Sequence, residues 1–262
     1  MASTKLNDLA TTFQNLHRPG KPVILANVYD GASASAVAPL ESCSAVATAS
    51  YAVAKAAGVE DDDLTLDQNL AAVRVVAKVV ARHGNKPLTA DFQDGYGDRL
   101  VEAVTSIIEA GVVGINIEDC DKETQRMMPA DVAAGRVSLV MKTARDLGVP
   151  NFVVNARCDT LVRGGEMDEV IARGGKYLEA GATTVFVWGG SRRGVSRAEV
   201  ERMTEAFDGR LSVSYKWSHD GLSIKELAEI GVARISVGPR IQMFAMEEVA
   251  KRAEELLKQG DV

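Results

Sequence analysis

The sequence predicts an α/β protein built as a single (β/α)8 barrel of the TIM type, and three observations support this fold class. Short β-branched runs alternate with longer segments of helical period, which is typical of parallel strands covered by helices. Eight such runs can be counted in 262 residues, a usual size for this barrel. Six glycines, 22 to 37 residues apart, each follow a helical pattern and precede a strand: Gly84, Gly111, Gly148, Gly181, Gly209 and Gly231.

The expected elements follow one another at regular intervals. Several strands are apolar almost throughout, as strands buried on both faces should be. The eight expected strands are Val23 to Asp30, Ala45 to Ser50, Leu88 to Asp91, Gly114 to Glu118, Phe152 to Asn155, Thr183 to Trp188, Leu211 to Tyr215 and Arg234 to Val237. Residues 1–20 form a helical lead-in, and residues 239–258 form a terminal helical segment. Between the second and third strands, Thr65 and Gln68 indicate a capping box before a helix that runs to His83.

The remaining helices fill the gaps between strands, and Asp98 is expected to cap the one that runs to Ala110. No linker rich in proline, serine or charge divides the chain, so residues 1–262 are expected to form one domain. A doubly wound open sheet is the competing architecture, because it shows the same alternation of strands and helices.

Composition excludes several classes of function. The net charge is -6, from 30 basic and 36 acidic residues without a basic block, which argues against nucleic acid or an anionic membrane as a partner. Every apolar run is too short to span a bilayer, and residues 1–20 lack an apolar signal core. Three dispersed cysteines fit neither a disulfide framework nor a zinc ribbon. We therefore expect a cytoplasmic protein.

Polar residues end most of the predicted strands, at the face where barrel enzymes place their active sites. Carboxylates from the third and fourth strands, Asp91 and Glu118, would face each other there. Oxygen ligands beside one basic residue, Arg157, suit Mg²⁺ or Mn²⁺ together with a carboxylate substrate. Each of these residues could instead cap a helix or form an ion pair. The other strand-end residues are Asp30, Ser50, Gln93, Asp94, Asp119, Asn155, Asp159, Trp188 and Lys216.

Other familiar sites are disfavoured. Gly95-Tyr-Gly97 lacks the third glycine of a dinucleotide-binding motif. The three histidines, His17, His83 and His219, are far apart and none ends a strand, so we expect solvated surface histidines and no histidine metal site.

Four motifs together resemble the isocitrate lyase and phosphoenolpyruvate mutase superfamily. They are Leu88-Thr-Ala-Asp-Phe-Gln-Asp-Gly-Tyr-Gly97, Gly114-Ile-Asn-Ile-Glu-Asp119, Asn155-Ala-Arg-Cys-Asp159 and Gly231-Val-Ala-Arg-Ile-Ser-Val-Gly238. The resemblance implies a barrel that binds magnesium and a 2-oxo acid or its enolate. It also implies chemistry at the carbon next to the oxo group.

The resemblance assigns roles to individual residues. It implies a metal site of Asp91, Glu118 and Asp61, with Gln93 where the family usually has an acidic residue. It implies that Arg157, in the motif that begins at Asn155, grips the substrate carboxylate. The segment of Ser50, Tyr51 and Ala52 would receive the other end of that carboxylate and the oxo group. Trp188 replaces a polar residue, which suggests a substrate tail less charged than a second carboxylate.

Family members differ in a mobile loop after the fourth strand, here Asp119 to Pro129. The Lys-x-Cys-Gly-His motif of the lyases and the Lys-Thr-Asn-Ser pattern of the mutases are both absent, although Lys122 and Thr124 loosely echo the second. The general acid or base therefore stays open among Cys120, Lys122, Tyr51 and Lys216. We expect this loop to act as a lid over bound substrate.

The leading hypothesis is a magnesium-dependent lyase or hydrolase that acts on a carbon–carbon bond of a 2-oxo or 2-hydroxy acid through a metal-stabilised enolate. The alternatives are a phosphonate mutase or hydrolase acting on a carbon–phosphorus bond, an aldolase using Lys216 as a Schiff-base amine, and a non-catalytic barrel that binds 2-oxo acids. The resemblance also implies a homotetramer in which the terminal helix packs on a neighbouring subunit. That helix has an apolar side, as such packing requires.

Overall fold

The protein is described by a computed structural model that covers residues 2–84, 86–217 and 221–259. Within these residues, nine parallel strand segments form one sheet. They are β1 (Val23–Leu25), β2 (Asn27–Val28), β3 (Val46–Thr48), β4 (Leu88–Asp91), β5 (Gly114–Glu118), β6 (Val153–Cys158), β7 (Thr184–Val187), β8 (Leu211–Ser214) and β9 (Arg234–Ser236).

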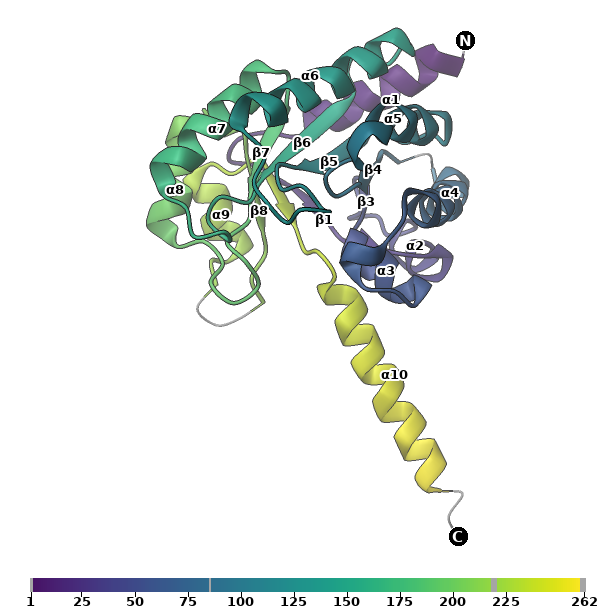
Figure 1. The fold of residues 1–262 in the computed structure, drawn as a ribbon. Coiled ribbons are helices and arrows are strands. Elements are labelled where there is room, and N and C mark those ends of the chain that lie inside the picture. Colours follow the sequence, from purple (N-terminus) through teal and green to yellow (C-terminus); the bar gives the residue numbers. More distant parts are fainter. Residues whose placement is uncertain (1, 85, 218–220, 260–262) are drawn as a thin grey trace.

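The sheet curls into a barrel that closes within the first predicted strand. Its order is β1-β9-β8-β7-β6-β5-β4-β3-β2, and β1 and β2 are consecutive halves of one pass interrupted at Ala26. Because β1 pairs with β9 and β2 pairs with β3, the two ends of the sheet meet there (Figure 1). The predicted (β/α)8 barrel is confirmed, and the open-sheet alternative is wrong.

Asn27 bridges this interruption with its side chain. Its Nδ2 donates to the carbonyl oxygen of Thr48 at 2.7 Å, and its Oδ1 accepts from the N–H groups of Val237 and Gly238 at 3.1 and 3.0 Å. A buried amide that satisfies backbone groups on both sides replaces the ladder bonds that the interruption removes.

Apart from the interruption at Ala26 and the end of β6, the strand boundaries agree with the sequence to within two residues. Strand β6 was expected to end at Asn155 but continues to Cys158, so Arg157 lies within it, opposite Glu118 and Phe186. The sequence pattern ended the strand early because arginine is rarely found in an apolar run. Here its charge is balanced by acidic neighbours, which are described below.

Helices surround the barrel and occupy the predicted gaps: α1 (Ala2–Leu16), α2 (Gly31–Val37), α3 (Ser50–Ala57), α4 (Leu66–Arg82), α5 (Leu100–Glu109), α6 (Ala130–Asp146), α7 (Met167–Glu179), α8 (Arg197–Ala206), α9 (Ile224–Ile230) and α10 (Arg240–Lys258). All six punctuating glycines have positive φ, and the capping box at Thr65 forms. The expected cap at Asp98 is wrong, because this residue lies in a 3-10 turn, Gly97–Arg99, and α5 begins without a side-chain cap. Asp30 was expected to end the first strand, but β2 ends at Val28 and Asp30 caps α2.

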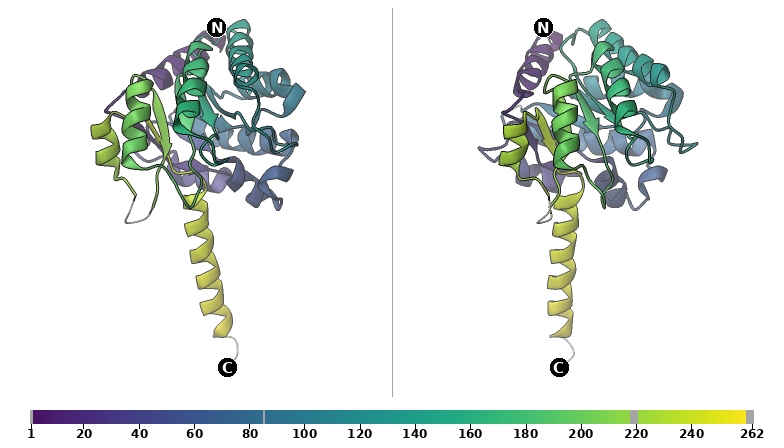
Figure 2. Two further views of the ribbon diagram at one scale, coloured as in Figure 1. Left: turned by 60° about the vertical axis from the view of Figure 1, so that its left-hand side comes forward. Right: turned by 90° about the vertical axis from the view of Figure 1, so that its left-hand side faces the viewer.

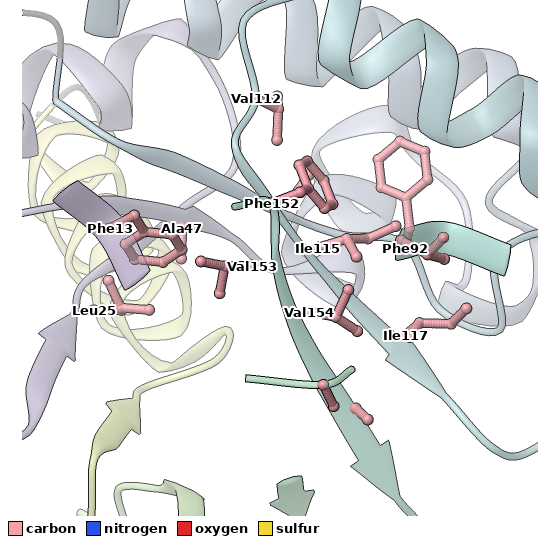
Figure 3. Packing of buried hydrophobic residues seen from close by; sticks show 14 of the residues in the cluster. Phe13, Leu25, Ala47, Phe92, Val112, Ile115, Ile117, Phe152, Val153 and Val154 are labelled. Carbon is pink, nitrogen blue, oxygen red and sulfur yellow. The ribbon is translucent and has the colours of Figure 1, made fainter. Parts of the chain in front are cut away.

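Helix α1 closes the end of the barrel at which the strands begin. Phe13 lies in a cluster with Leu25, Ala47 and Val153 (Figure 3). A Cβ atom added to Gly114 would lie 2.9 Å from the Phe13 ring, so only glycine leaves room for this plug. The opposite end, where the strands finish, is left for the site.

The expectation of surface histidines is wrong for His17. Its Nδ1 donates to the Phe13 carbonyl oxygen at 2.8 Å, and its buried Nε2 has no partner. Burial, assisted by the positive charge of Arg234, lowers the pKa of His17 to about 3. His83 is half-buried, and His219 lies outside the described residues.

Helix α10 stands away from the barrel (Figures 1 and 2), and it confirms the predicted terminal helix. Of its nineteen residues, all of them described, Gln242 alone is buried. Large apolar side chains are exposed along it: Met243, Phe244, Met246, Val249, Leu256 and Leu257. The packing of this helix on a neighbouring subunit stays a prediction. In the described ranges, no helix has the length and apolar character needed to cross a membrane.

Candidate active site

A cavity of about 860 Å³ opens at the end of the barrel where the strands finish. Most of the predicted site residues line it. They are Ser50, Tyr51, Asp61, Asp91, Gln93, Glu118, Cys120, Lys122, Arg157, Trp188 and Lys216. The barrel therefore brings together residues from across the sequence, from the start of α3 to the end of β8.

Two predicted substrate-binding residues do not line the cavity. The Ala52 side chain is buried, and its carbonyl oxygen accepts from Nε2 of Gln242 at 2.7 Å. Asn155 is fully buried deeper in the barrel, where its Nδ2 donates to Asn116 and its Oδ1 accepts from Thr184 at 2.6 Å. Because Asn155 lies two residues before Arg157, it points to the same interior from a deeper layer. The structure thus gives Asn155 the position of a support for Asn116, which lines the cavity.

Arg157 is fixed by two carboxylates. Its Nε and Nη2 donate to the two oxygens of Asp159 at 2.6 and 2.9 Å, and Nη2 lies 3.0 Å from Oε2 of Glu118. Asp159 is itself oriented, since its N–H donates to Asp119 at 2.9 Å. No described residue accepts a hydrogen bond from Nη1 of Arg157. This leaves one edge of a rigid guanidinium able to bind an anion.

Trp188 covers the flat face of Arg157. The guanidinium carbon lies 4.3 Å from the centre of the Trp188 ring, which is within the range of a cation–π contact. Trp188 therefore acts on the site through Arg157 as well as by adding apolar surface. The expectation that this tryptophan goes with a less charged substrate tail stays a prediction.

Asp91 connects β4 to the start of α3. Its carboxylate accepts the N–H of Ser50 at 2.9 Å, and its own N–H donates to Oγ1 of Thr48 at 2.9 Å. Ser50 is the first residue of α3, so the expectation that it ends a strand is wrong. Helix N-termini carry unpaired N–H groups and a partial positive charge, which explains why a carboxylate lies there.

Gln93 joins three segments around the cavity. It adopts a positive φ of 48°, which is uncommon for a residue with a side chain. Its Nε2 donates to the carbonyl oxygen and to Oδ1 of Asp61 at 2.6 and 3.0 Å, while its Oε1 accepts from Nζ of Lys122 at 2.9 Å. Lys122 also donates to the carbonyl oxygen of Leu64 and lies 5.3 Å from the centre of the Tyr96 ring. The predicted lid loop is thus docked against the site.

The carboxylates of the site are buried close enough together to oppose one another's ionisation. Burial and the charge of Asp91 raise the pKa of Asp61 to about 6. Burial also raises the pKa of Glu118 well above its usual value, against the lowering effect of Arg157. Carboxylates that oppose one another's ionisation in this way are stabilised when a cation lies among them.

The four proposed metal ligands fit a divalent cation by their chemistry. Asp61, Asp91, Glu118 and Gln93 offer oxygen atoms, which magnesium and manganese prefer. In the part of the chain that the structure describes, however, no group of three or more His, Cys, Asp or Glu side chains is arranged to hold a metal ion. The ion pair of Glu118 with Arg157 is one reason, because it engages an oxygen that a metal would need.

Cys120 follows β5 at the base of the lid loop and lines the cavity. Its Sγ accepts from Nη2 of Arg163 at 3.0 Å. Burial raises the pKa of this thiol, and the charges of Asp159 and Glu118 act in the same direction, while Arg163 opposes them. Burial is the largest of these effects, and it favours the neutral thiol over the thiolate.

Sequence reasoning missed two charged residues of the site. Asp159 was noted only as a strand-end residue, although its place two positions after Arg157, directly after the end of β6, was a signal that the two could pair. Arg234, on β9, is 2% exposed and lines the cavity, and its Nη1 has no hydrogen-bond partner. Its alternation with Ser236 was the available signal for an inward-facing side chain.

The sequence profile of the phosphoenolpyruvate phosphomutase family matches residues 13–257. This chain belongs to that family. A protein of Mycobacterium tuberculosis without a characterised function is 31% identical over 230 residues, which cover 87% of this chain and 81% of that protein. The 2-methylisocitrate lyase of Escherichia coli is 30% identical over 132 residues, covering 47% of this chain and 42% of the lyase.

The similarity extends to solved structures. That of a Burkholderia cenocepacia protein, named as a candidate phosphonomutase, superimposes with a TM-score of 0.85 at 32% identity and covers 97% of this chain and 99% of that protein. The resemblance inferred from the four motifs is therefore confirmed. The named members of the phosphoenolpyruvate phosphomutase family and its relatives are enzymes, both mutases and lyases.

Proposed function

We propose that this member of the phosphoenolpyruvate phosphomutase family is a metal-dependent lyase that breaks a carbon–carbon bond of a 2-oxo or 2-hydroxy acid. The observation that carries the proposal is the position of Arg157. One edge of its guanidinium is held by Asp159 and Glu118, and no described residue binds its Nη1, while Asp61 and Asp91 line the same cavity. A cation next to a cluster of oxygen ligands suits a substrate that has both a carboxylate and an adjacent oxygen atom.

The substrate carboxylate would lie between Arg157 and the start of α3. Val53 is the first residue of α3 whose N–H bonds to the backbone carbonyl of Ala49, and the N–H of Ser50 is engaged by Asp91. The N–H groups of Tyr51 and Ala52 therefore remain to bind an anion, so Ala52 would contribute through its backbone. Both contacts hold a planar carboxylate in one orientation, which reduces the entropy lost in reaching the transition state.

Asp61, Asp91, Glu118 and Gln93 would hold the divalent cation, Mg²⁺ or Mn²⁺. The bound ion would supply Lewis-acid stabilisation of negative charge on the substrate oxygen. Glu118 would have to exchange part of its contact with Arg157 for this role. That exchange would couple the arrival of the cation to the freeing of the guanidinium for substrate.

Proton transfer completes the reaction. For a 2-hydroxy acid, the hydroxyl proton passes to a base, the carbon–carbon bond breaks, and an acid returns a proton to the departing carbon. Cys120, Lys122, Tyr51 and Lys216 all line the cavity and are the candidates. Burial favours the neutral form of Cys120, which suits an acid, and burial lowers the pKa of Lys122, which suits a base.

A second candidate is chemistry on the carbon–phosphorus bond of a phosphonate, which the match to the phosphomutase profile favours. Phosphorus NMR of the protein incubated with phosphonopyruvate would detect it as a new phosphate-ester or free phosphate signal. The lyase proposal predicts no change in that spectrum.

A substrate screen tests the lyase. Each of a panel of 2-hydroxy and 2-oxo acids would be incubated with the protein and Mg²⁺, and new 2-oxo acid would be measured by a coupled dehydrogenase. We expect turnover that EDTA abolishes and that Asp91→Ala lacks. Turnover that persists in EDTA and is trapped on Lys216 by borohydride would contradict the proposal in favour of a Schiff-base aldolase.

A further inference from the structure

Arg234 is a buried cation that the reaction described above does not use. It lies on β9 with 2% of its surface exposed, inside the barrel and at the inner wall of the cavity. Its guanidinium carbon is 6.0 Å from the centre of the Phe13 ring, so it lies between the plug of the barrel and the space above. Its Nε makes one long contact, 3.5 Å, to Oγ of Ser236, and its Nη1 has no hydrogen-bond partner in the described part of the chain.

An arginine in this environment is energetically unfavourable on its own. Buried arginines are almost always paired, since an unpaired charge loses its hydration without compensation. None of the described carboxylates lies within 4.0 Å of the Arg234 guanidinium. Burial lowers its pKa to about 9, with the negative charge of Asp91 opposing the shift, so the group is still a cation at neutral pH.

Other unsatisfied donors share the same interior. Ser212 lies directly opposite Arg234 in the pairing of β8 with β9, and its buried hydroxyl has no partner. The hydroxyl of Thr89 lines the cavity as Arg234 does, and it too is buried and without a hydrogen-bond partner among the described residues. Unpaired donors of this kind around a cation mark a place where acceptor atoms are missing.

We propose that the floor of the cavity is an anion subsite, in which the guanidinium of Arg234 and the hydroxyl of Ser212 bind a carboxylate or a small inorganic anion. The subsite is separate from Arg157, which has its own carboxylate partners. It would take the anion on the side of the cavity formed by β8 and β9.

This inference rests on the proposed function where it concerns the substrate. If the anion is part of the substrate, the acid carries a second carboxylate, and the substrate class narrows to 2-oxo or 2-hydroxy diacids. The alternative reading is that Arg234 only offsets the charge of Asp91 at a distance. That reading leaves Nη1 and the Ser212 hydroxyl without partners, whereas an anion satisfies both.

Matched ligands test the subsite. Calorimetry in the presence of Mg²⁺ would compare 2-oxo diacids of five and six carbons with 2-oxo acids of equal length that end in a methyl group. We expect wild type to prefer the diacid, and Arg234→Met to reduce the preference roughly tenfold or more while still binding the methyl-ended acid. Arg240→Gln makes a similar charge change elsewhere on the cavity wall and should keep the preference.

A second measurement needs no substrate and no metal. If the subsite takes free inorganic anions, chloride in place of gluconate should raise the melting temperature of wild type and leave that of Arg234→Met unchanged. Arg234→Met itself should melt higher than wild type in gluconate, because it removes an uncompensated buried charge. Arg234→Lys keeps the charge and should retain part of the chloride effect.

The outcomes separate the two proposals. A diacid preference with no chloride effect identifies the substrate as the source of the anion, and a chloride effect identifies a free anion. The subsite is overturned if wild type binds both ligands of each pair equally and does not respond to chloride, or if Arg234→Met retains both effects. If wild type does not bind oxalate in a metal-dependent way, the proposed lyase is contradicted. The chloride measurement still tests the subsite in that case.

Discussion

At the scale of single residues, the site is defined by how Arg157 is held. Asp159 binds two of its nitrogens, Glu118 approaches one of these, and Trp188 covers its face. These contacts need the planar guanidinium group of arginine, because the ammonium group of a lysine could make only some of them. The orientation of the remaining edge toward substrate is therefore a property of arginine specifically.

Arg157→Lys should weaken binding of oxalate in the presence of Mg²⁺ by about tenfold or more, which corresponds to about 1.4 kcal/mol. Lysine keeps the charge but loses the bidentate contacts. Calorimetry would measure the affinity, with Arg163→Lys as a control that makes the same change at an exposed arginine of the cavity. An affinity equal to that of wild type would remove Arg157 from the substrate site.

His17 should make the stability of the protein depend on pH. Its folded-state pKa of about 3 lies below the usual 6.5, so the unfolded chain takes up a proton that the folded chain cannot accept. The contribution of His17 to the free energy of unfolding is fully present above about pH 6.5 and decreases as the pH is lowered. Between about pH 7.5 and about pH 5 the loss is roughly 2 kcal/mol.

The raised pKa values of Asp61 and Glu118 act in the opposite direction, because those groups gain stability as the pH falls. Urea unfolding at both pH values should therefore compare wild type with His17→Gln. We expect the variant to lose about 2 kcal/mol less than wild type on acidification. The same loss in both proteins would show that His17 is protonated in the folded state.

At the scale of elements, the loop from Asp119 to Pro129 is the segment best placed to cover the substrate. Its base is fixed, since Cys120 and Met127 form a β-bridge and the N–H of Met128 donates to Asp119 at 2.8 Å. Its tip reaches the site through Lys122, which binds Gln93. A fixed base with one side chain in the site suits a lid that closes as a unit.

Trypsin offers a test of this lid. Cleavage after Lys122 and Arg126 should slow markedly when Mg²⁺ and oxalate are both present, because the closed loop is protected. Lys122→Met removes one cleavage site and also the contact with Gln93, so cleavage after Arg126 should be faster in the free protein. Cleavage after Lys251 on α10 serves as a control. If the rates are equal with and without ligand, although calorimetry shows that it binds, the segment is not a lid.

At the scale of the whole molecule, α10 is the helix that buries least of its surface against its own chain. It extends from the barrel (Figure 2). Six of its large apolar side chains are exposed. An apolar surface of this kind is typical of an interface between proteins.

We expect the protein to form a homotetramer in which α10 packs on a neighbouring subunit. Light scattering at micromolar concentration would measure the mass. Val249→Asp with Leu256→Asp should give smaller species, whereas Glu247→Asp, on the same helix, should not. A strictly monomeric mass for wild type would contradict the expected assembly.

The pattern of strands and helices could be predicted because it is local. Apolar runs, capping pairs and positive-φ glycines each specify a short segment. Eight strand-and-helix units in this order are compatible with only a few folds. The co-location of Asp91, Glu118 and Arg157 follows, since a barrel gathers its strand ends. The pairing of Arg157 with Asp159 could have been suggested by their two-residue spacing. The turned backbone of Gln93 and the burial of Arg234 could not be predicted, because each depends on contacts between distant segments.

The central claim is that Asp91 and Glu118 create a metal site at which a 2-oxo acid binds. Calorimetric titration of oxalate, a planar mimic of the pyruvate enolate, tests it most directly in wild type, Asp91→Ala and Glu118→Ala, each with Mg²⁺ and with EDTA. Glu60→Ala, a change at another carboxylate on the cavity wall, is the control. The account predicts binding that requires Mg²⁺ and is lost in both site variants but not in the control. Metal-dependent affinity unchanged in both variants, or equal affinity in EDTA, would contradict it.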